Sequence, residues 1–309
     1  MGFDTVEILP DLFFVERGYL NANHFVYTGE PPVLIDTGYI ADFEATRRAV
    51  EGLGVRLEDV TAVLTTHCHC DHIGGHRLIH QHSGCDILLH EVGKYFIESK
   101  DDWSTWWRYY GQQAAFFPCT RGLKDGEIVA VGPHRFEVIH TPGHASDGTV
   151  FYNRDHRLLI SSDTLWERDM AVHTVRVEGS AAVYWTQKSL EKIAGLSVTR
   201  VCPGHGRMFT DFKGAVERAM ERVERFLADP RQVGTDVLKK ITVYTLLMKQ
   251  PVDESAFFEL LMGTHWFGET VDLYFGGDYR KKYNDTLSAL LERGVVQRYD
   301  GRLTTTVKP

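Results

Sequence analysis

The chain has 309 residues, 43% of them hydrophobic and 25% charged, which is typical of a globular protein of one or two domains. A net charge of −8 argues against a nucleic-acid partner, because phosphate binding needs a basic surface. No apolar run is long enough to span a membrane, and the first residues lack the basic and apolar segments of a secretion signal. The five cysteines include no CxxC pair, which indicates reduced thiols and predicts a cytoplasmic protein.

The first part of the chain is predicted to consist of short strands at 5–9, 12–15, 24–28 and 33–36. The last of these ends in Asp36-Thr37-Gly38, before a helix predicted over about 40–53. Asp36 fits two roles equally well on this pattern. It can cap that helix, or it can be a carboxylate that orients a ligand histidine.

An apolar, β-branched run over 60–66 predicts a buried strand that leads directly into a polar cluster. The cluster reads His67-Cys68-His69-Cys70-Asp71-His72. Imidazole and carboxylate together suit zinc, with iron or manganese as less common occupants. His67 and His69 can share one face of an extended segment, so Cys68 and Cys70 are expected to face the other way and pack. Two metal centres need about seven ligands, so further ligands must come from elsewhere in the chain.

The stretch 101–121 differs from its surroundings, which are predicted as a helix over 75–82, a strand over 86–90 and a helix over 91–99. It is rich in aromatic residues, several of them at helical spacing: Trp103, Trp106, Trp107 and Tyr110. They fit an amphipathic helix packed on the body of the protein, or the lid or wall of an apolar substrate pocket. These four residues and His173 are the candidate substrate-binding residues.

The second half repeats the strand pattern, with strands predicted at 128–131, 135–141, 149–153 and 157–162, a helix over 181–194 and a strand over 198–202. Three strand ends there carry further candidate ligands: His144, Asp163 and His205. Both histidines follow Pro-Gly, which fixes a tight turn and presents the side chain at its tip.

The tail contains a predicted helix over 211–228, a linker over 229–234, helices over 234–249, 254–262 and 278–293, and a hairpin over 294–306 around Asp300-Gly301. Three helices and a hairpin predict a winged-helix-like module. From 234 to 309 there are ten Lys and Arg against ten Asp and Glu, so no basic recognition face for nucleic acid is evident. A packing role or a homodimer contact is favoured for this module.

The order His67-x-His69-x-Asp71-His72, then His144, Asp163 and His205, resembles the metallo-β-lactamase-fold hydrolase superfamily over roughly residues 3–210. The resemblance implies an α+β fold, a four-layer αββα sandwich with its site at one edge of the sheets. The tail is similar to the winged-helix-like extension of one branch of the superfamily. The expected division is a catalytic domain over 1–229, with the aromatic-rich insertion at about 101–121, and a helical domain over 234–309.

The resemblance also implies a role for each candidate ligand. One ion is expected on His67, His69 and His144, a second on Asp71, His72 and His205, with Asp163 bridging them. Asp36 corresponds to the carboxylate that orients a ligand histidine, and Asp71 is the candidate proton carrier, so both are expected to serve catalysis. Zinc is the expected metal at both positions, with iron or manganese as alternatives.

Two divalent ions can lower the pKa of a shared water to about 7 and generate hydroxide. The sequence therefore predicts a hydrolase of a small-molecule ester, thioester or lactone with an apolar portion. A phosphodiesterase or nuclease on the same ligands is the main alternative, and a mononuclear iron dioxygenase of sulfur substrates is another. A non-enzymatic binding module on a relic site is disfavoured by the complete ligand set. A β-lactamase is disfavoured because no export signal is evident.

Overall fold

The computed structural model describes residues 4–309, whose first sheet has seven strands in sequence order. They are β1 (Asp4–Leu9), β2 (Leu12–Glu16), β3 (His24–Tyr27), β4 (Val33–Ile35), β5 (Ala62–Leu64), β6 (Asp86–His90) and β7 (Arg121–Leu123). Strands β1 to β4 pair antiparallel and β4 to β7 pair parallel. The carboxyl ends of β4 and β5 therefore lie at the same edge of the sheet.

The second sheet has five strands in the order β12-β11-β10-β9-β8. They are β8 (Ile128–Val131), β9 (His134–His140), β10 (Thr149–Asn153), β11 (Leu158–Ser162) and β12 (Arg200–Pro203). The meander β8 to β11 is antiparallel, as alternating apolar residues and turns predict, whereas β12 joins β11 in parallel after a helical crossover.

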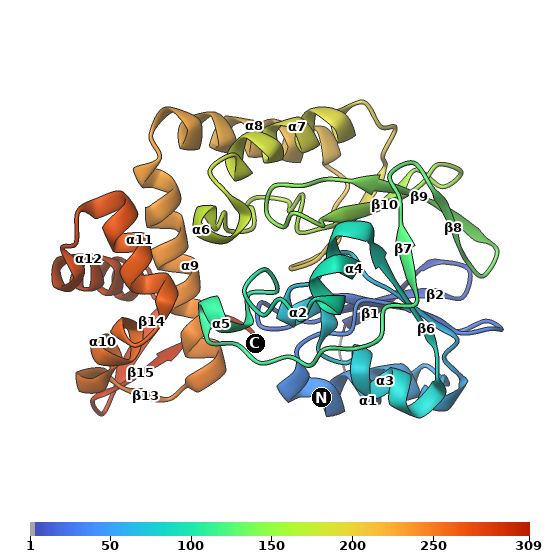
Figure 1. Cartoon of the computed structure of the whole chain (residues 1–309), viewed down its shortest axis with the longest axis horizontal. Helices are drawn as coiled ribbons and strands as arrows, with labels where there is room; N and C mark the ends of the chain where they lie inside the picture. The colour runs from blue at the N-terminus through green and yellow to red at the C-terminus, as the bar shows by residue number, and fades with distance from the viewer. Residues whose placement is uncertain (1–3) are drawn as a thin grey trace.

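Helices cover the outer faces of both sheets, and an apolar core fills the space between them (Figure 1). Phe14 and Phe25 of the first sheet meet Phe136 and Phe151 of the second in that core. Helices α1 (Phe43–Gly52), α3 (His76–Ser83) and α4 (Glu91–Glu98) cover the first sheet, and α7 (Ala182–Ala194) and α8 (Phe212–Ala228) cover the second. The predicted four-layer αββα sandwich is confirmed.

The tail is mostly helical, with a small sheet in the order β13-β15-β14. Its elements are α9 (Arg231–Lys249), β13 (Val252–Asp253), α10 (Glu254–Met262), α11 (His265–Phe275), α12 (Tyr279–Glu292), β14 (Val296–Tyr299) and β15 (Arg302–Thr305). The predicted hairpin is present. The predicted linker over 229–234 is not, because only residues 229 and 230 lie between α8 and α9. Within residues 4–309, no helix combines the length and the apolar character that a membrane span requires.

Two stretches differ from their sequence pattern. Helix α11 forms where no helix was predicted, because Trp266, Phe267 and Val271 bury one face of it despite flanking and internal glycines. The aromatic stretch forms only the single turn α5 (Trp107–Tyr110). Trp106 has φ 69°, a left-handed conformation that prevents the helix from starting earlier.

Candidate metal centre

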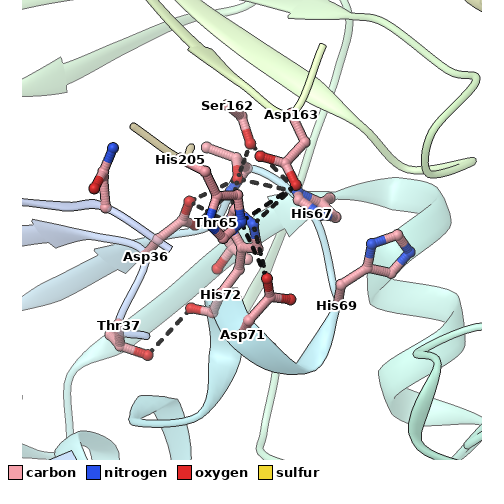
Figure 2. A network of polar contacts seen from close by, with 12 residues as sticks. Asp36, Thr37, Thr65, His67, His69, Asp71, His72, Ser162, Asp163 and His205 are labelled. Carbon is pink, nitrogen blue, oxygen red and sulfur yellow. Dashed lines mark hydrogen bonds and ion pairs between the residues drawn. The ribbon is translucent and has the colours of Figure 1, made fainter. Parts of the chain in front are cut away.

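The candidate ligands lie at the ends of strands that meet at one edge of the sandwich. Strand β5 leads into His67 and the short helix α2 (Cys70–Ile73), β11 ends just before Asp163, and β12 ends two residues before His205. Figure 2 shows Asp36, Asp163 and His205 gathered around His72. Residues up to 169 positions apart thus share one buried site, because the two sheets present these ends together.

The first group of ligand atoms comes from His67, His69 and His144, which lie within 4.8 Å of one another. His69 Nδ1 is 3.1 Å from His144 Nε2. The Nε2 atom of His67 is buried and has no hydrogen-bond partner among the described residues. Burial holds the pKa of both His67 and His69 well below the ordinary value, so these rings are neutral, which is the form that binds metal.

The second group comes from Asp71, His72 and His205, again within 4.8 Å. His205 Nε2 lies 3.2 Å from Asp71 Oδ2, and His72 Nε2 lies 3.9 Å from the same oxygen. Burial alone would lower the pKa of His72, but neighbouring carboxylates, Asp36 foremost, raise it well above the ordinary value. More carboxylate charge therefore surrounds the second group than the first.

Asp163 lies between the two groups. Its Oδ2 atom is 3.4 Å from His144 Nε2 in the first group. The same atom is 3.5 Å from His72 Nε2 and 3.6 Å from His205 Nε2 in the second. Burial would raise the pKa of Asp163, but His205 and His72 hold it well below the ordinary value, so the carboxylate is ionised. One oxygen is thus within reach of ligands from both groups.

Asp36 fixes both His72 and the strand that precedes the cluster. Its Oδ2 is 2.8 Å from His72 Nδ1 and accepts the hydroxyl of Thr66 at 2.7 Å. Its Oδ1 accepts the N–H of Thr66 at 2.9 Å. The residue has φ 56°, a strained conformation for a non-glycine, and the surrounding contacts hold it there. These contacts favour the role of orienting a ligand histidine over that of a helix cap, and Asp36 makes no capping hydrogen bond to α1.

Two further ligand histidines, His144 and His205, each have one ring nitrogen beside a backbone carbonyl. His144 Nδ1 lies 2.8 Å from the carbonyl oxygen of Val172. His205 Nδ1 lies 2.9 Å from the carbonyl oxygen of Gly18. Donation from Nδ1 sets the tautomer that leaves Nε2 free as a ligand, which is the usual arrangement around protein-bound metals.

Glu178 is a buried carboxylate beside the first group that the sequence pattern does not reveal. It ends the short helix α6 (Val175–Glu178), and its Oε1 lies 3.5 Å from His69 Nε2 and accepts the Trp106 indole N–H at 3.2 Å. Its Oε2 accepts the N–H of Ser146 at 2.7 Å. Burial raises the pKa of Glu178 to about 7. No motif surrounds this residue in the sequence, so only the structure connects it with the site.

A family model described as the metallo-beta-lactamase superfamily matches residues 18–205, which include every candidate ligand. The chain belongs to the metallo-β-lactamase superfamily. This confirms the resemblance drawn from the ligand order, and with it the prediction of a metal-dependent hydrolase.

Within this superfamily, the chain is similar to proteins that are named as a hydrolase or a thioesterase. A hydroxyacylglutathione hydrolase from Rhizobium johnstonii is 28% identical over 218 residues, covering 69% of this chain and 75% of that protein. An acyl-coenzyme A thioesterase from Gallus gallus is 24% identical over 161 residues, covering 47% of this chain and 56% of that protein. A metallo-β-lactamase family protein of known structure from Thermus thermophilus has a TM-score of 0.63 at 22% identity, covering 97% of this chain and all of the other.

The superfamily implies divalent metal ions, and the residues present fit them. The buried Nε2 atoms of His67 and His72 have no hydrogen-bond partner within residues 4–309, which is costly for a folded protein unless something else occupies them. Five imidazoles and two carboxylates form the donor set, and nitrogen and oxygen ligands of this kind suit zinc, iron or manganese.

A cavity of about 650 Å³ opens from the ligand groups, a size typical of small-molecule sites. Its floor contains Asp71, His144, Asp163 and His205. Beside them, Tyr19 stacks on His205 at 5.9 Å between ring centroids, and the Trp166 indole N–H donates to Asp163 Oδ1 at 3.2 Å. Apolar residues form much of its wall: Trp106, Ala171, Val172, Phe226, Ile241, Val243, Leu247, Leu290, Val295 and Val307.

Of the candidate substrate-binding residues, the structure brings Trp106 to this cavity. Its ring stacks on His69 with 3.7 Å between ring centroids. The side chains of Trp103, Trp107 and Tyr110 pack in apolar clusters instead. His173 lines a second, much smaller cavity, which also contacts His144 and Asp163. Its Nε2 is 2.7 Å from Thr186 Oγ1, and burial lowers its pKa to about 3.

The two cysteines of the cluster are buried, and their surroundings are those of packing residues. Cys68 joins the apolar cluster on the outer face of the first sheet, and Cys70 packs with Leu20 and Tyr39. Neither cysteine forms a disulfide.

Proposed function

We propose that this protein hydrolyses thioesters, and related esters or lactones, that carry an apolar portion. The observation that carries the proposal is the single cavity that joins the shared carboxylate of Asp163 to a largely apolar wall. The names of the hydroxyacylglutathione hydrolase and acyl-coenzyme A thioesterase relatives support the thioester class, because both describe cleavage of a carbonyl–sulfur bond.

We assign the first ion to His67, His69 and His144, the second to Asp71, His72 and His205, and the bridge to Asp163. Zinc is the proposed metal at both positions, since imidazole and carboxylate are its usual ligands. Ions bound there would supply Lewis acidity toward a carbonyl oxygen and would lower the pKa of water to about 7.

Proton transfer, exclusion of water and orientation of the ligands are assigned to side chains of the protein. We assign to Asp71 the transfer of a proton to the leaving group, since its carboxylate lines the cavity floor. Trp106 covers His69 and excludes water from that side of the site. Asp36 holds His72 in one orientation and so supports the second ion without contacting the substrate.

Replacing a ligand from each part of the site tests the assignment. We expect His67→Ala and Asp163→Ala to lower kcat/KM for a nitrophenyl ester and an acyl thioester by more than about 100-fold and to reduce bound metal. His82→Ala, at an exposed position of α3, is the matched control and should keep full activity. Unchanged turnover in either ligand variant would contradict the proposal.

The same assay separates the alternatives. Faster cleavage of bis-nitrophenyl phosphate than of every ester and thioester would favour the phosphodiesterase. Elemental analysis showing one iron per chain, with no zinc, would favour the sulfur dioxygenase. Two zinc ions per chain together with thioester cleavage are the expected result.

A further inference from the structure

Part of the cavity lining is basic, although the chain as a whole has a net charge of −8. The basic residues come from α8, α9 and the end of α12, and they are Arg222, Arg225, Lys239, Lys240 and Arg293. The same cavity has the candidate metal ligands on its floor. A substrate bound over the metal groups therefore shares its cavity with these cations.

Two of these five cations are already neutralised by the protein. Lys240 Nζ lies 2.9 Å from Asp169 Oδ1 and 2.9 Å from Asp236 Oδ2. Arg222 forms an ion pair with Asp169 and lies 3.9 Å from Asp236 Oδ1. Two cations and two carboxylates make a balanced cluster, which needs no ligand to complete it.

The other three cations, Arg225, Lys239 and Arg293, have no such compensation. Within residues 4–309, these three side chains form no ion pair and no hydrogen bond; Arg225 and Arg293 are exposed to solvent, and Lys239 is half-buried. Both remaining carboxylates that line the cavity, Asp71 and Asp163, belong to the metal groups. Three cations without a carboxylate partner thus line one cavity, and their positive charge favours an anionic ligand there.

We propose that Arg225, Lys239 and Arg293 form an anion subsite that binds phosphate groups on the thiol portion of a thioester substrate. This inference rests on the proposed function and names its substrate class more narrowly. Guanidinium and ammonium groups bind phosphate through charge-assisted hydrogen bonds, and a phosphate monoester carries about −1.5 to −2 charges. A thiol such as glutathione matches the subsite less well, because its ammonium group offsets part of its carboxylate charge.

The anion subsite gives the tail a role in substrate recognition. Lys239 is on α9 and Arg293 follows α12, whereas Arg225 is on α8 of the sandwich. The three cations line the same cavity because α9 packs against α8 and α12 packs against α9. A nucleic-acid surface is not needed to explain these cations, since they line a cavity rather than an extended face.

Binding of uncleavable probes tests the subsite directly. The subsite variant is Arg225→Gln/Lys239→Gln/Arg293→Gln. The matched control is Arg48→Gln/Arg77→Gln/Lys213→Gln, which removes the same three charges from exposed positions that do not line the cavity. Calorimetry on the zinc-loaded proteins measures binding of S-methyl-coenzyme A and of S-methylglutathione.

We expect the subsite variant to bind S-methyl-coenzyme A at least about tenfold more weakly than wild type, and the control variant to bind it as wild type does. Wild type should bind S-methylglutathione more weakly than the coenzyme A probe. Absence of coenzyme A binding by wild type, equal binding by the subsite variant, or tighter binding of the glutathione probe would each overturn the proposal.

Kinetics then separate this inference from the proposed function. The substrates are one acyl group carried on coenzyme A and on the neutral thiol N-acetylcysteamine. In the subsite variant, the ratio of kcat/KM for the coenzyme A ester to that for the neutral ester should fall about tenfold, and an unchanged ratio would overturn the subsite. If wild type cleaves neither ester but binds the thioether through these cations, the subsite stands and the thioesterase function fails.

Discussion

Two buried carboxylates outside the ligand set fix the backbone of the histidine cluster. Asp36 accepts the N–H of Thr66, and Asp147 accepts the N–H of Cys68 at 2.9 Å. These two backbone groups flank His67 in the chain. The position of a candidate ligand therefore depends on residues that never contact an ion, and substitutions there should affect the site in separable ways.

Asp36→Asn should weaken the second ion selectively. The amide keeps the size of the side chain but removes the charge beside His72 Nδ1, 2.8 Å away. We expect the affinity for the second ion to fall by about 10- to 100-fold while the first ion stays bound. Zinc titration with a competing chelator measures both affinities. Equal weakening of the two ions would contradict the assignment of Asp36 to His72.

Asp147→Asn should change how stability depends on pH. Burial raises the pKa of Asp147 from its ordinary 3.8 to about 6. The folded state therefore binds this proton more tightly than the unfolded state does. The resulting stabilisation is complete below pH about 3.8 and is lost as pH rises through about 6. Asparagine does not ionise and still offers Cys68 an acceptor.

The variant should therefore gain up to about 3 kcal/mol relative to wild type as pH rises from about 4 to 7. Urea unfolding of both proteins in metal-free buffer, repeated across this range, measures the difference. A constant difference between the two proteins at all pH values would show that Asp147 does not titrate in this way.

Among the elements, β11 and β12 determine how Asp163 and His205 meet. They run parallel with Ser162 opposite Pro203, so the residues after them emerge at the same sheet edge. A hydrogen bond holds the two strand ends together, because Gly204 N–H donates to the carbonyl oxygen of Ser162 at 2.8 Å. A Cβ on Gly204 would lie 2.1 Å from Asp163 Oδ1, so no larger residue fits without moving that carboxylate.

Gly204→Ala should therefore displace the Asp163 carboxylate, although it replaces no ligand. We expect a loss of bound metal and a fall in kcat/KM of about 10-fold or more, since Asp163 must shift. Gly52→Ala on α1, where a Cβ meets open space, is the matched control. Wild-type metal content in the Gly204 variant would show that the turn can adapt.

At the scale of the whole molecule, α9 links the tail to the sandwich. Its residues Val237 and Ile241 belong to the apolar core of the tail, Val233 packs on the cluster beneath α7 and α8, and Leu247 packs with Tyr39 of the first half. The division into 1–229 and 234–309 remains a proposal. If that division holds, α9 begins at the boundary and packs against both parts, so no flexible linker connects them.

Metal removal should lower the stability of the whole chain, because the candidate ligands come from both halves of the sandwich. Binding to the folded state alone adds about 2.7 kcal/mol when free ion exceeds its Kd 100-fold. We expect the zinc-loaded protein to have a Tm roughly 5–10 °C above that of the chelator-treated protein. Calorimetric scans of both forms measure this shift, and identical Tm values would argue against ions held by the described ligand groups.

The sequence by itself predicted the residues whose ligand atoms the structure brings within 4.8 Å, and the resemblance of their order to a known superfamily implied the αββα sandwich. The candidate ligands depend on local signals, because these histidines and aspartates follow predicted strands and two of the histidines follow Pro-Gly. The tertiary structure alone decided which aromatic residue of the 101–121 stretch lines the cavity, that Glu178 reaches His69, and that cations from α8, α9 and α12 line the same cavity. Such contacts join residues far apart in the chain, and they depend on how helices dock, which leaves no periodic trace in the sequence.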